Sequence, residues 1–209
     1  MKKKLAFTLL ETIIVISVFC VGILTVLYGI SQTLRNQDYA KTQIQSAFFA
    51  REWIEMVFNL RDANYHKELP WNCVFEWSSN LTEDWCKEKL EPWKVLKLDI
   101  WNNDKYINIE VSEDSIWDLK EDEEFDKIFE KFQIYKHVDD NTFVYNHIKE
   151  WWEETWFARY LVIKSVEWVS SNNSDDNLLK IESHVLYKKW IFKWEKVVET
   201  FIWNYEFNQ

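Results

Sequence analysis

Glu11 is the residue whose type and position most clearly indicate chemistry. It is the only charged side chain in the apolar run that follows Lys2, Lys3 and Lys4 and extends to Ile30. A carboxylate facing lipid costs at least ~2.5 kcal/mol, so an acid in such a run is a functional candidate that is expected to meet a partner charge. The chemistry indicated is an ion pair, with an amine as the expected partner.

Cys73 and Cys86 are the second pair of candidates. They lie in an irregular segment that contains Pro70 and Pro92. Outside a membrane two thiols can oxidise, and closing a loop of this length would stabilise the fold by about 3 kcal/mol on the chain-entropy estimate. We predict a disulfide between them. A zinc site is the weaker alternative, because no further Cys or His has helpful spacing and Cys20 lies in the apolar run.

The sequence contains no motif typical of an enzyme. It has no glycine-rich nucleotide loop, no HExxH and no nucleophile elbow. Four histidines occur singly, at His66, His137, His147 and His184, and single histidines indicate structural or surface roles. Two acidic stretches, 121–126 and 172–177, offer oxygen ligands to Ca²⁺, but the EF-hand spacing is absent and solvated loops are the favoured interpretation. We predict no catalytic site, no metal site and no cofactor.

The elements that must position these residues begin with one long helix. Residues 7–31 form its transmembrane half, because about 20 apolar residues span a bilayer. Residues 32–62 continue as an amphipathic half, since no Pro interrupts them and apolar residues recur at helical spacing. The predicted apolar stripe consists of Ala40, Ile44, Ala47, Phe48, Ile54, Val57 and Phe58. The lysines before the run predict a cytoplasmic N-terminus, with everything after about Gln32 outside.

The rest of the chain indicates a β-rich head, residues 94–209, after the irregular segment 63–93. Short runs of alternating apolar and polar residues, separated by turn residues, predict antiparallel strands. The predicted strands are Lys94–Ile100, Lys105–Val111, Phe125–His137, Thr142–His147, Phe157–Glu167, Leu178–Lys188 and Lys196–Tyr205. The fold class is therefore α+β, with a long N-terminal helix packed on a C-terminal antiparallel β-meander.

The sequence Lys-Lys-Lys-Leu-Ala-Phe-Thr-Leu-Leu-Glu, which ends at Glu11, resembles the leader and cleavage site of type IV pilins and pseudopilins. The resemblance implies that a prepilin peptidase removes residues 1–6, cutting between Ala6 and Phe7, and that the new N-terminus is methylated. It also implies that Glu11 pairs with the α-amine of a neighbouring subunit during assembly. The family usually has Gly before the cut, where this chain has Ala6.

Two later parts of the chain resemble the same family. Residues 50–65 are similar to the end of the long helix in pilin-like proteins of bacteria with very small genomes, where the position of Trp53 is typically Gly. The last three predicted strands loosely resemble the terminal meander of minor pilins and pseudopilins. Because most of the 209 residues remain after the predicted cut, the chain is large for a major pilin, and a minor pilin or pseudopilin is favoured.

The resemblance also implies partners and a location. The expected partners are other pilin subunits, the prepilin peptidase, an inner-membrane assembly platform and membrane lipid. The expected location is a single-pass membrane protein that later enters an extracellular filament, either a type IV pilus or a type II secretion-like one. A formal net charge of −10 without a basic stripe argues against nucleic acid. The alternatives are a plain signal anchor and a membrane-anchored extracellular binding module outside any filament.

The composition adds a separate hypothesis, because the chain has 14 Trp and only 2 Gly. Glycine normally makes up about 7% of residues, so Gly is scarce by roughly the number of Trp present. Several Trp also stand in turn contexts, where Gly supplies positive φ. Examples are Trp71, Trp93, Trp101, Trp151 and Trp203. One interpretation is a bacterium that reads UGA as Gly; the other is a genuinely Trp-rich surface that stacks on sugars or other planar ligands.

Overall fold

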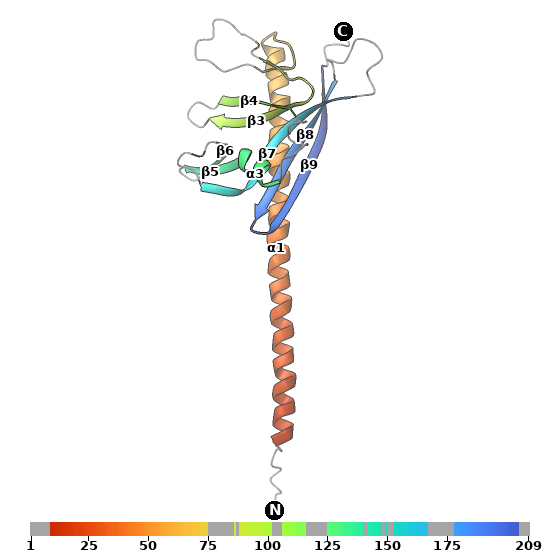
Figure 1. Cartoon of the computed structure of the whole chain (residues 1–209), viewed down its shortest axis with the longest axis vertical. Helices are drawn as coiled ribbons and strands as arrows, with labels where there is room; N and C mark the ends of the chain where they lie inside the picture. Colours follow the sequence, from red (N-terminus) through yellow and green to blue (C-terminus); the bar gives the residue numbers. More distant parts are fainter. Residues whose placement is uncertain are drawn as a thin grey trace, which may run out of the picture. The chain divides into compact units, whose positions relative to one another are not determined.

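The computed structural model describes residues 9–74, 86, 88–101, 106–115, 125–139, 142–147, 149, 153–166 and 178–204. The chain divides into two compact units, Met1–Gln45 and Ser46–Gln209. In the first unit the described residues form helix alone. The second unit, here named the head, contains the second half of that helix and an antiparallel sheet (Figure 1). The predicted α+β class is confirmed.

Helix α1 spans Leu9–His66 and confirms the single long helix, which extends one turn beyond its predicted end. No Pro interrupts it, and its last turn closes with a Schellman motif. In this motif the Leu69 N–H donates to the Asn64 carbonyl (2.9 Å) and the Glu68 N–H donates to the Tyr65 carbonyl (3.2 Å). Glu68 accordingly has a left-handed backbone, with φ of 57°.

The sheet of the head has seven strands, and all its pairings are antiparallel. Strand β7 is central: β8 pairs along one of its edges, whereas β3 and β5 share the other edge. The strands are β3 (Lys94–Trp101), β4 (Tyr106–Ser115), β5 (Gln133–Asp139), β6 (Thr142–Asn146), β7 (Glu153–Ser165), β8 (Leu178–Lys189) and β9 (Phe192–Trp203). A separate two-stranded pair, β1 (Cys73–Val74) and β2 (Glu88–Lys89), lies in the segment expected to be irregular.

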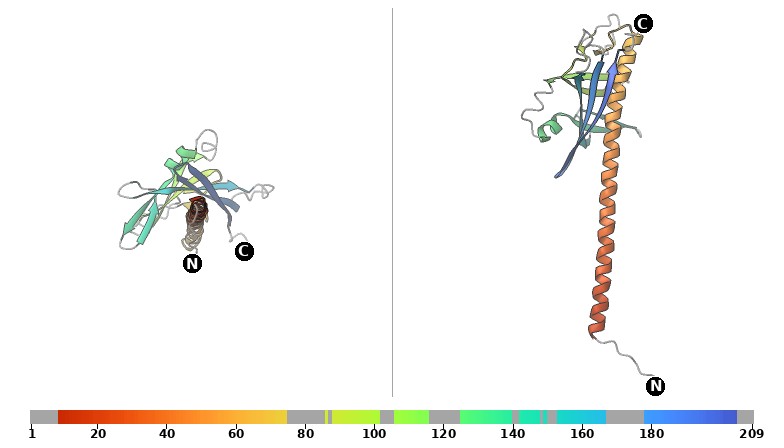
Figure 2. Two further views of the ribbon diagram at one scale, coloured as in Figure 1. Left: turned by 90° about the horizontal axis from the view of Figure 1, so that it is seen from below. Right: turned by 90° about the vertical axis from the view of Figure 1, so that its right-hand side faces the viewer.

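The core of the head lies between α1 and one face of this sheet. Buried residues of α1 recur every three or four positions, which places them on one side of the helix. They are Ser46, Phe49, Ala50, Trp53, Ile54, Met56, Val57, Leu60 and Asn64. Trp53 and Leu60 share one apolar cluster with Leu161, Ile181 and Ile202 of the sheet. Both views in Figure 2 show the sheet on one side of the helix in the head.

The predicted apolar stripe of α1 is wrong in part. Ile54 and Val57 are buried as expected, but Ile44 is exposed and Phe48 is 67% exposed. Phe49, one position after Phe48, is buried in its place. Successive helical residues point about 100° apart, so a one-residue error in the stripe turns a large side chain away from the sheet.

The predicted strand Phe125–His137 is also wrong in its first half. Residues Phe125–Lys131 form helix α3, and strand β5 begins only at Gln133. Phe125 and Phe129 stand four residues apart, and their rings stack with centroids 6.3 Å apart, an arrangement that a helix permits and a strand does not. Asp126 in the first turn and Lys131 in the last turn suit the helix dipole.

Strands β7 and β9 begin earlier than predicted, at Glu153 and Phe192. For β9 the reason is that the turn after Lys189 is only two residues long, so pairing resumes at once. Other expectations lie outside the described residues: the leader, the turn at 102–105, the acidic residues 121–124 and 172–177, and Trp151.

Candidate membrane-anchoring and assembly site

The first half of α1 is apolar and exposed. Within the described residues it provides one helix that is long and apolar enough to cross a bilayer, and none of its apolar window is buried. Its hydroxyl groups are satisfied inside the helix: Thr25 Oγ1 donates to the Val21 carbonyl (2.8 Å) and Thr33 Oγ1 to the Gly29 carbonyl (2.9 Å). Such internal hydrogen bonds remove the cost of placing hydroxyls in hydrocarbon.

Glu11 lies in the first turn of α1. A carboxylate is favoured there because the unpaired N–H groups and the helix dipole give this end a partial positive charge. From Leu9 to Leu34 it is the only charged residue of the helix. Ala6 and Phe7, the residues of the predicted cleavage site, lie outside the described residues.

Cys73 and Cys86 form the predicted disulfide, with Cα atoms 5.4 Å apart. The segment that carries Cys73 is fixed to the end of α1 by Asn64. The Asn64 Nδ2 donates to the carbonyls of Trp71 (3.1 Å) and Cys73 (2.7 Å). A buried amide that makes two backbone hydrogen bonds, followed closely by a disulfide, sets the path of the chain as it leaves the helix.

Arg159 of β7 joins the sheet to α1 and is completely buried. Its Nη1 donates to Glu52 Oε2 (2.6 Å), and its Nη2 donates to the Tyr145 carbonyl (3.1 Å). Its guanidinium carbon lies 4.6 Å from the ring centroid of Trp53 and 5.5 Å from that of Phe49. The charge is therefore enclosed by one carboxylate and two aromatic faces, which compensates for its lost hydration.

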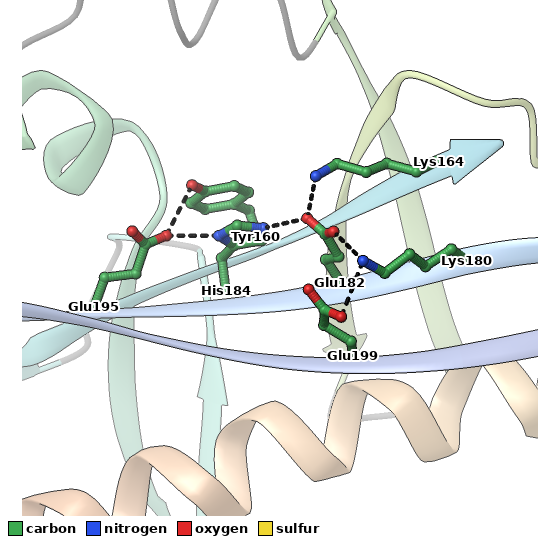
Figure 3. Close-up of polar contacts among 7 residues, drawn as sticks. All are labelled: Tyr160, Lys164, Lys180, Glu182, His184, Glu195 and Glu199. Carbon is green, nitrogen blue, oxygen red and sulfur yellow. Dashed lines mark hydrogen bonds and ion pairs between the residues drawn. The ribbon is translucent and has the colours of Figure 1, made fainter. Parts of the chain in front are cut away.

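A cluster of polar residues lies on the sheet face opposite to α1, and Figure 3 shows it. The members of this polar cluster are Tyr160, Lys164, Lys180, Glu182, His184, Glu195 and Glu199. They come from three adjacent strands, β7, β8 and β9, and the register places Tyr160 opposite His184 and Lys164 opposite Lys180. The alternation of side chains along β8 explains the arrangement, because positions 180, 182 and 184 point to the same face.

Glu182 is the centre of the polar cluster. It accepts hydrogen bonds from Lys164 (2.6 Å) and Lys180 (2.9 Å), and Lys180 also donates to Glu199 (2.9 Å). Glu182 and Glu199 are directly opposite each other on β8 and β9, where two like charges would repel. Lys180 bridges them, so the repulsion is replaced by two ion pairs.

Burial disfavours the charged form of Glu182, but the hydrogen bonds from Lys164 and Lys180 outweigh this and lower its pKa to about 2. The hydrogen bond from His184 lowers the pKa of Glu195. Burial, with Glu195 nearby, raises the pKa of the Tyr160 hydroxyl far above its usual value. Glu182 and Glu195 are therefore held as carboxylates at neutral pH, and Tyr160 keeps its proton.

His184 lies between two carboxylates. Its Nδ1 is 2.6 Å from Glu195 Oε1 and its Nε2 is 3.3 Å from Glu182 Oε2, and its ring stacks on Tyr160. Carboxylates only accept, so both contacts are hydrogen bonds when the ring is an imidazolium. In that form the positive charges of two lysines and His184 balance the three carboxylates. This arrangement suits structural charge compensation, not nucleophilic catalysis.

A cavity of about 490 Å³ lies beside α3 and the ends of β7 and β8. Its walls include the aromatic side chains of Phe129, Trp156 and Trp190, together with Glu154 and Lys188. Aromatic rings beside a few charged groups are a common arrangement in sites for sugars and other ring-shaped ligands.

Among the described residues no group of three or more His, Cys, Asp or Glu side chains is arranged to hold a metal ion. Comparison with protein-family models, with curated proteins and with solved structures found no significant match to the chain.

The sequence prediction missed Arg159 and the polar cluster. For the polar cluster a signal was present, because Lys180, Glu182 and His184 occupy every second position of a strand predicted correctly. For Arg159 there was none: its partner Glu52 is 107 positions away.

Proposed function

We propose that this chain is a structural subunit of a filament, a minor pilin or pseudopilin, that is held in the membrane before assembly. The observation that carries the proposal is helix α1. Its first half is exposed and apolar and bears Glu11, and its second half packs on the antiparallel sheet of the head. A bare apolar helix needs either lipid or other helices around it, and a filament core supplies the second as the membrane supplies the first.

In this proposal Glu11 selects and aligns the neighbouring subunit. A carboxylate in an apolar helix bundle is costly unless it meets an opposite charge. The α-amine of a neighbour that begins at Phe7 provides such a charge, so a correctly registered neighbour is favoured over a shifted one. Aligning the helices also aligns the heads, because Arg159 and the buried face of α1 join the sheet to the same helix.

The test is co-expression with a prepilin peptidase and the assembly machinery. Intact-mass measurement should show loss of residues 1–6 and an N-terminus at Phe7. Glu11→Ala should insert into the membrane normally and yet be strongly depleted from sheared filaments. The matched control is Asp38→Ala, which removes a carboxylate from the same helix outside the apolar run and should assemble normally. Normal incorporation of Glu11→Ala, or an uncleaved chain, contradicts the proposal.

A second candidate function is a membrane-anchored binding module that never enters a filament. The observation that favours it is the aromatic-lined cavity bounded by Phe129, Trp156 and Trp190. This candidate predicts that oligosaccharides quench the tryptophan fluorescence of the head and that Trp156→Ala weakens the binding. Immunolabelling would then find the protein on cells but not along filaments.

A further inference from the structure

Two tryptophans have backbone conformations that normally require glycine. Three non-glycine residues among those described have positive φ: Glu68 (57°), Trp93 (75°) and Trp190 (62°). For an L-residue this region brings the Cβ close to the backbone, and for a bulky side chain it is a clear outlier. Glu68 is accounted for by the Schellman motif at the end of α1, whereas Trp93 and Trp190 lie in turns between strands.

Trp93 occupies the glycine position of a type II turn. The turn runs from Glu91 to Lys94, and the Lys94 N–H donates to the Glu91 carbonyl (3.4 Å). Pro92 stands at the second position and φ is 75° at the third. Type II turns favour Pro at the second position and require positive φ, hence Gly, at the third. A Pro-Gly pair is the sequence that this turn favours.

Trp190 occupies the glycine position of a different turn. Lys189 of β8 pairs with Phe192 of β9, so Trp190 and Ile191 form a two-residue hairpin loop. Trp190 has positive φ and Ile191 does not. Positive φ at the first loop residue alone is the pattern of a type II′ turn, in which Gly takes that position.

The indole ring of Trp190 gains little burial that would offset the strain. Trp190 is 81% exposed and Trp93 is 38% exposed. Trp53 provides the contrast, since it lies inside a regular helix and is completely buried among core residues. The tryptophans are therefore not equivalent: some fill the core, and two stand where a side chain is a disadvantage.

We propose that residues 93 and 190 are glycines in the protein as its own organism makes it, specified by UGA codons that this organism translates as glycine. The deficit of glycine in the composition, 2 Gly against 14 Trp, agrees with this assignment. It does not rest on the filament proposal. Glycine at 190 also removes one aromatic wall of the cavity, which weakens the case for a sugar-binding module.

The decisive experiment is mass spectrometry of peptides from the native organism. Peptides that cover positions 93 and 190 should have the mass of glycine at both, and the gene should carry UGA at both codons. A tryptophan mass, or UGG codons, at either position overturns the proposal for that position.

A second experiment tests the backbone argument on the full-length chain in detergent micelles. Trp190→Ala removes the ring but keeps the Cβ, whereas Trp190→Gly removes both. The glycine variant should have a folded-to-unfolded ratio roughly five- to thirty-fold higher than the alanine variant, measured by denaturant unfolding followed by circular dichroism.

The matched control is Trp203, an exposed residue in β9 that has no positive φ. There the order should reverse, with Trp203→Gly less stable than Trp203→Ala, because glycine in an ordinary strand costs backbone entropy. The pair Trp93→Gly and Trp93→Ala should behave like the pair at 190. Glycine variants no more stable than their alanine counterparts at 93 and 190 would remove the conformational basis of the proposal.

Discussion

Glu182 is the residue whose ionisation contributes most directly to the stability of the folded head. It is 5% exposed, yet it carries a charge because Lys164 and Lys180 both donate to it. Its pKa is lowered from 4.5 in a free side chain to about 2 in the fold. A carboxyl group with a lowered folded-state pKa stabilises the fold above its unfolded pKa, and the contribution is lost as the pH falls through the folded pKa.

We therefore predict that the free energy of unfolding of the head falls as the pH drops from about 4.5 toward 2. Glu182→Gln should lower stability at neutral pH by about 1–3 kcal/mol, because two lysines lose their acceptor, and should flatten this acid dependence. Glu199→Gln is the matched control: this carboxylate is half-exposed and pairs with Lys180, and its loss should cost at most about 1 kcal/mol. Unfolding curves recorded at several acidic pH values measure the stability of both variants. If Glu182→Gln kept the pH dependence of the unchanged protein, Glu182 would not be its cause.

At the scale of elements, the junction between α1 and β7 depends on Arg159. Arg159→Ala should destabilise the head by about 3 kcal/mol, near the lower limit for breaking a buried ion pair, because Glu52 stays partly solvated when the guanidinium is gone. Arg51→Ala is the control on the neighbouring position of the helix. Its ion pair with Glu55 is exposed, so its loss should cost about 0–1 kcal/mol. Thermal unfolding of both variants compares the two values, and equal effects would refute the role of Arg159.

The elements that the sequence predicts correctly are those with a long or regular local pattern. Helix α1 follows from a long segment without Pro, and β8 from a short run rich in apolar and β-branched residues interrupted by Lys180, Glu182 and His184. Helix α3 was missed because Phe125, Phe129 and Phe132 are aromatic, and aromatic runs favour strands when considered locally. The packing of Phe129, and of Phe132 directly after the helix, in the core of the head helps to stabilise the helix there.

Within the candidate site, the disulfide could be predicted and Glu11 could be singled out as a candidate, because each depends on a property of the residue itself; the role of Glu11 stays a prediction. A charge in an apolar run, and two cysteines outside that run, can be recognised from the sequence alone. Arg159 and Glu182 could not be identified this way, since their partners are set by the packing of separate elements. The strained tryptophans could be predicted only in part. The composition indicates that some Trp stand at glycine positions, and the φ values of the structure identify positions 93 and 190.

At the scale of the whole molecule, the two units have surfaces of opposite character. The first unit exposes aliphatic and aromatic side chains along its helix, which suits lipid or other apolar helices. The head has an apolar core against α1 and carries paired charges on the sheet face opposite to the helix, which suits water. One continuous backbone helix, α1, contributes residues to both units.

Cys20 gives a direct test of whether the apolar half of α1 lies in a bilayer, because it is a free cysteine in that half. In intact cells a membrane-impermeant maleimide should fail to label Cys20, since the bilayer surrounds this part of the helix, and should label it after denaturation in detergent. In a Cys20→Ser background, the Asp38→Cys variant should be labelled from outside, because Lys2, Lys3 and Lys4 predict a cytoplasmic N-terminus. Labelling of Cys20 in intact cells would show that the run is not in the bilayer, and labelling of Asp38→Cys only after permeabilisation would reverse the orientation.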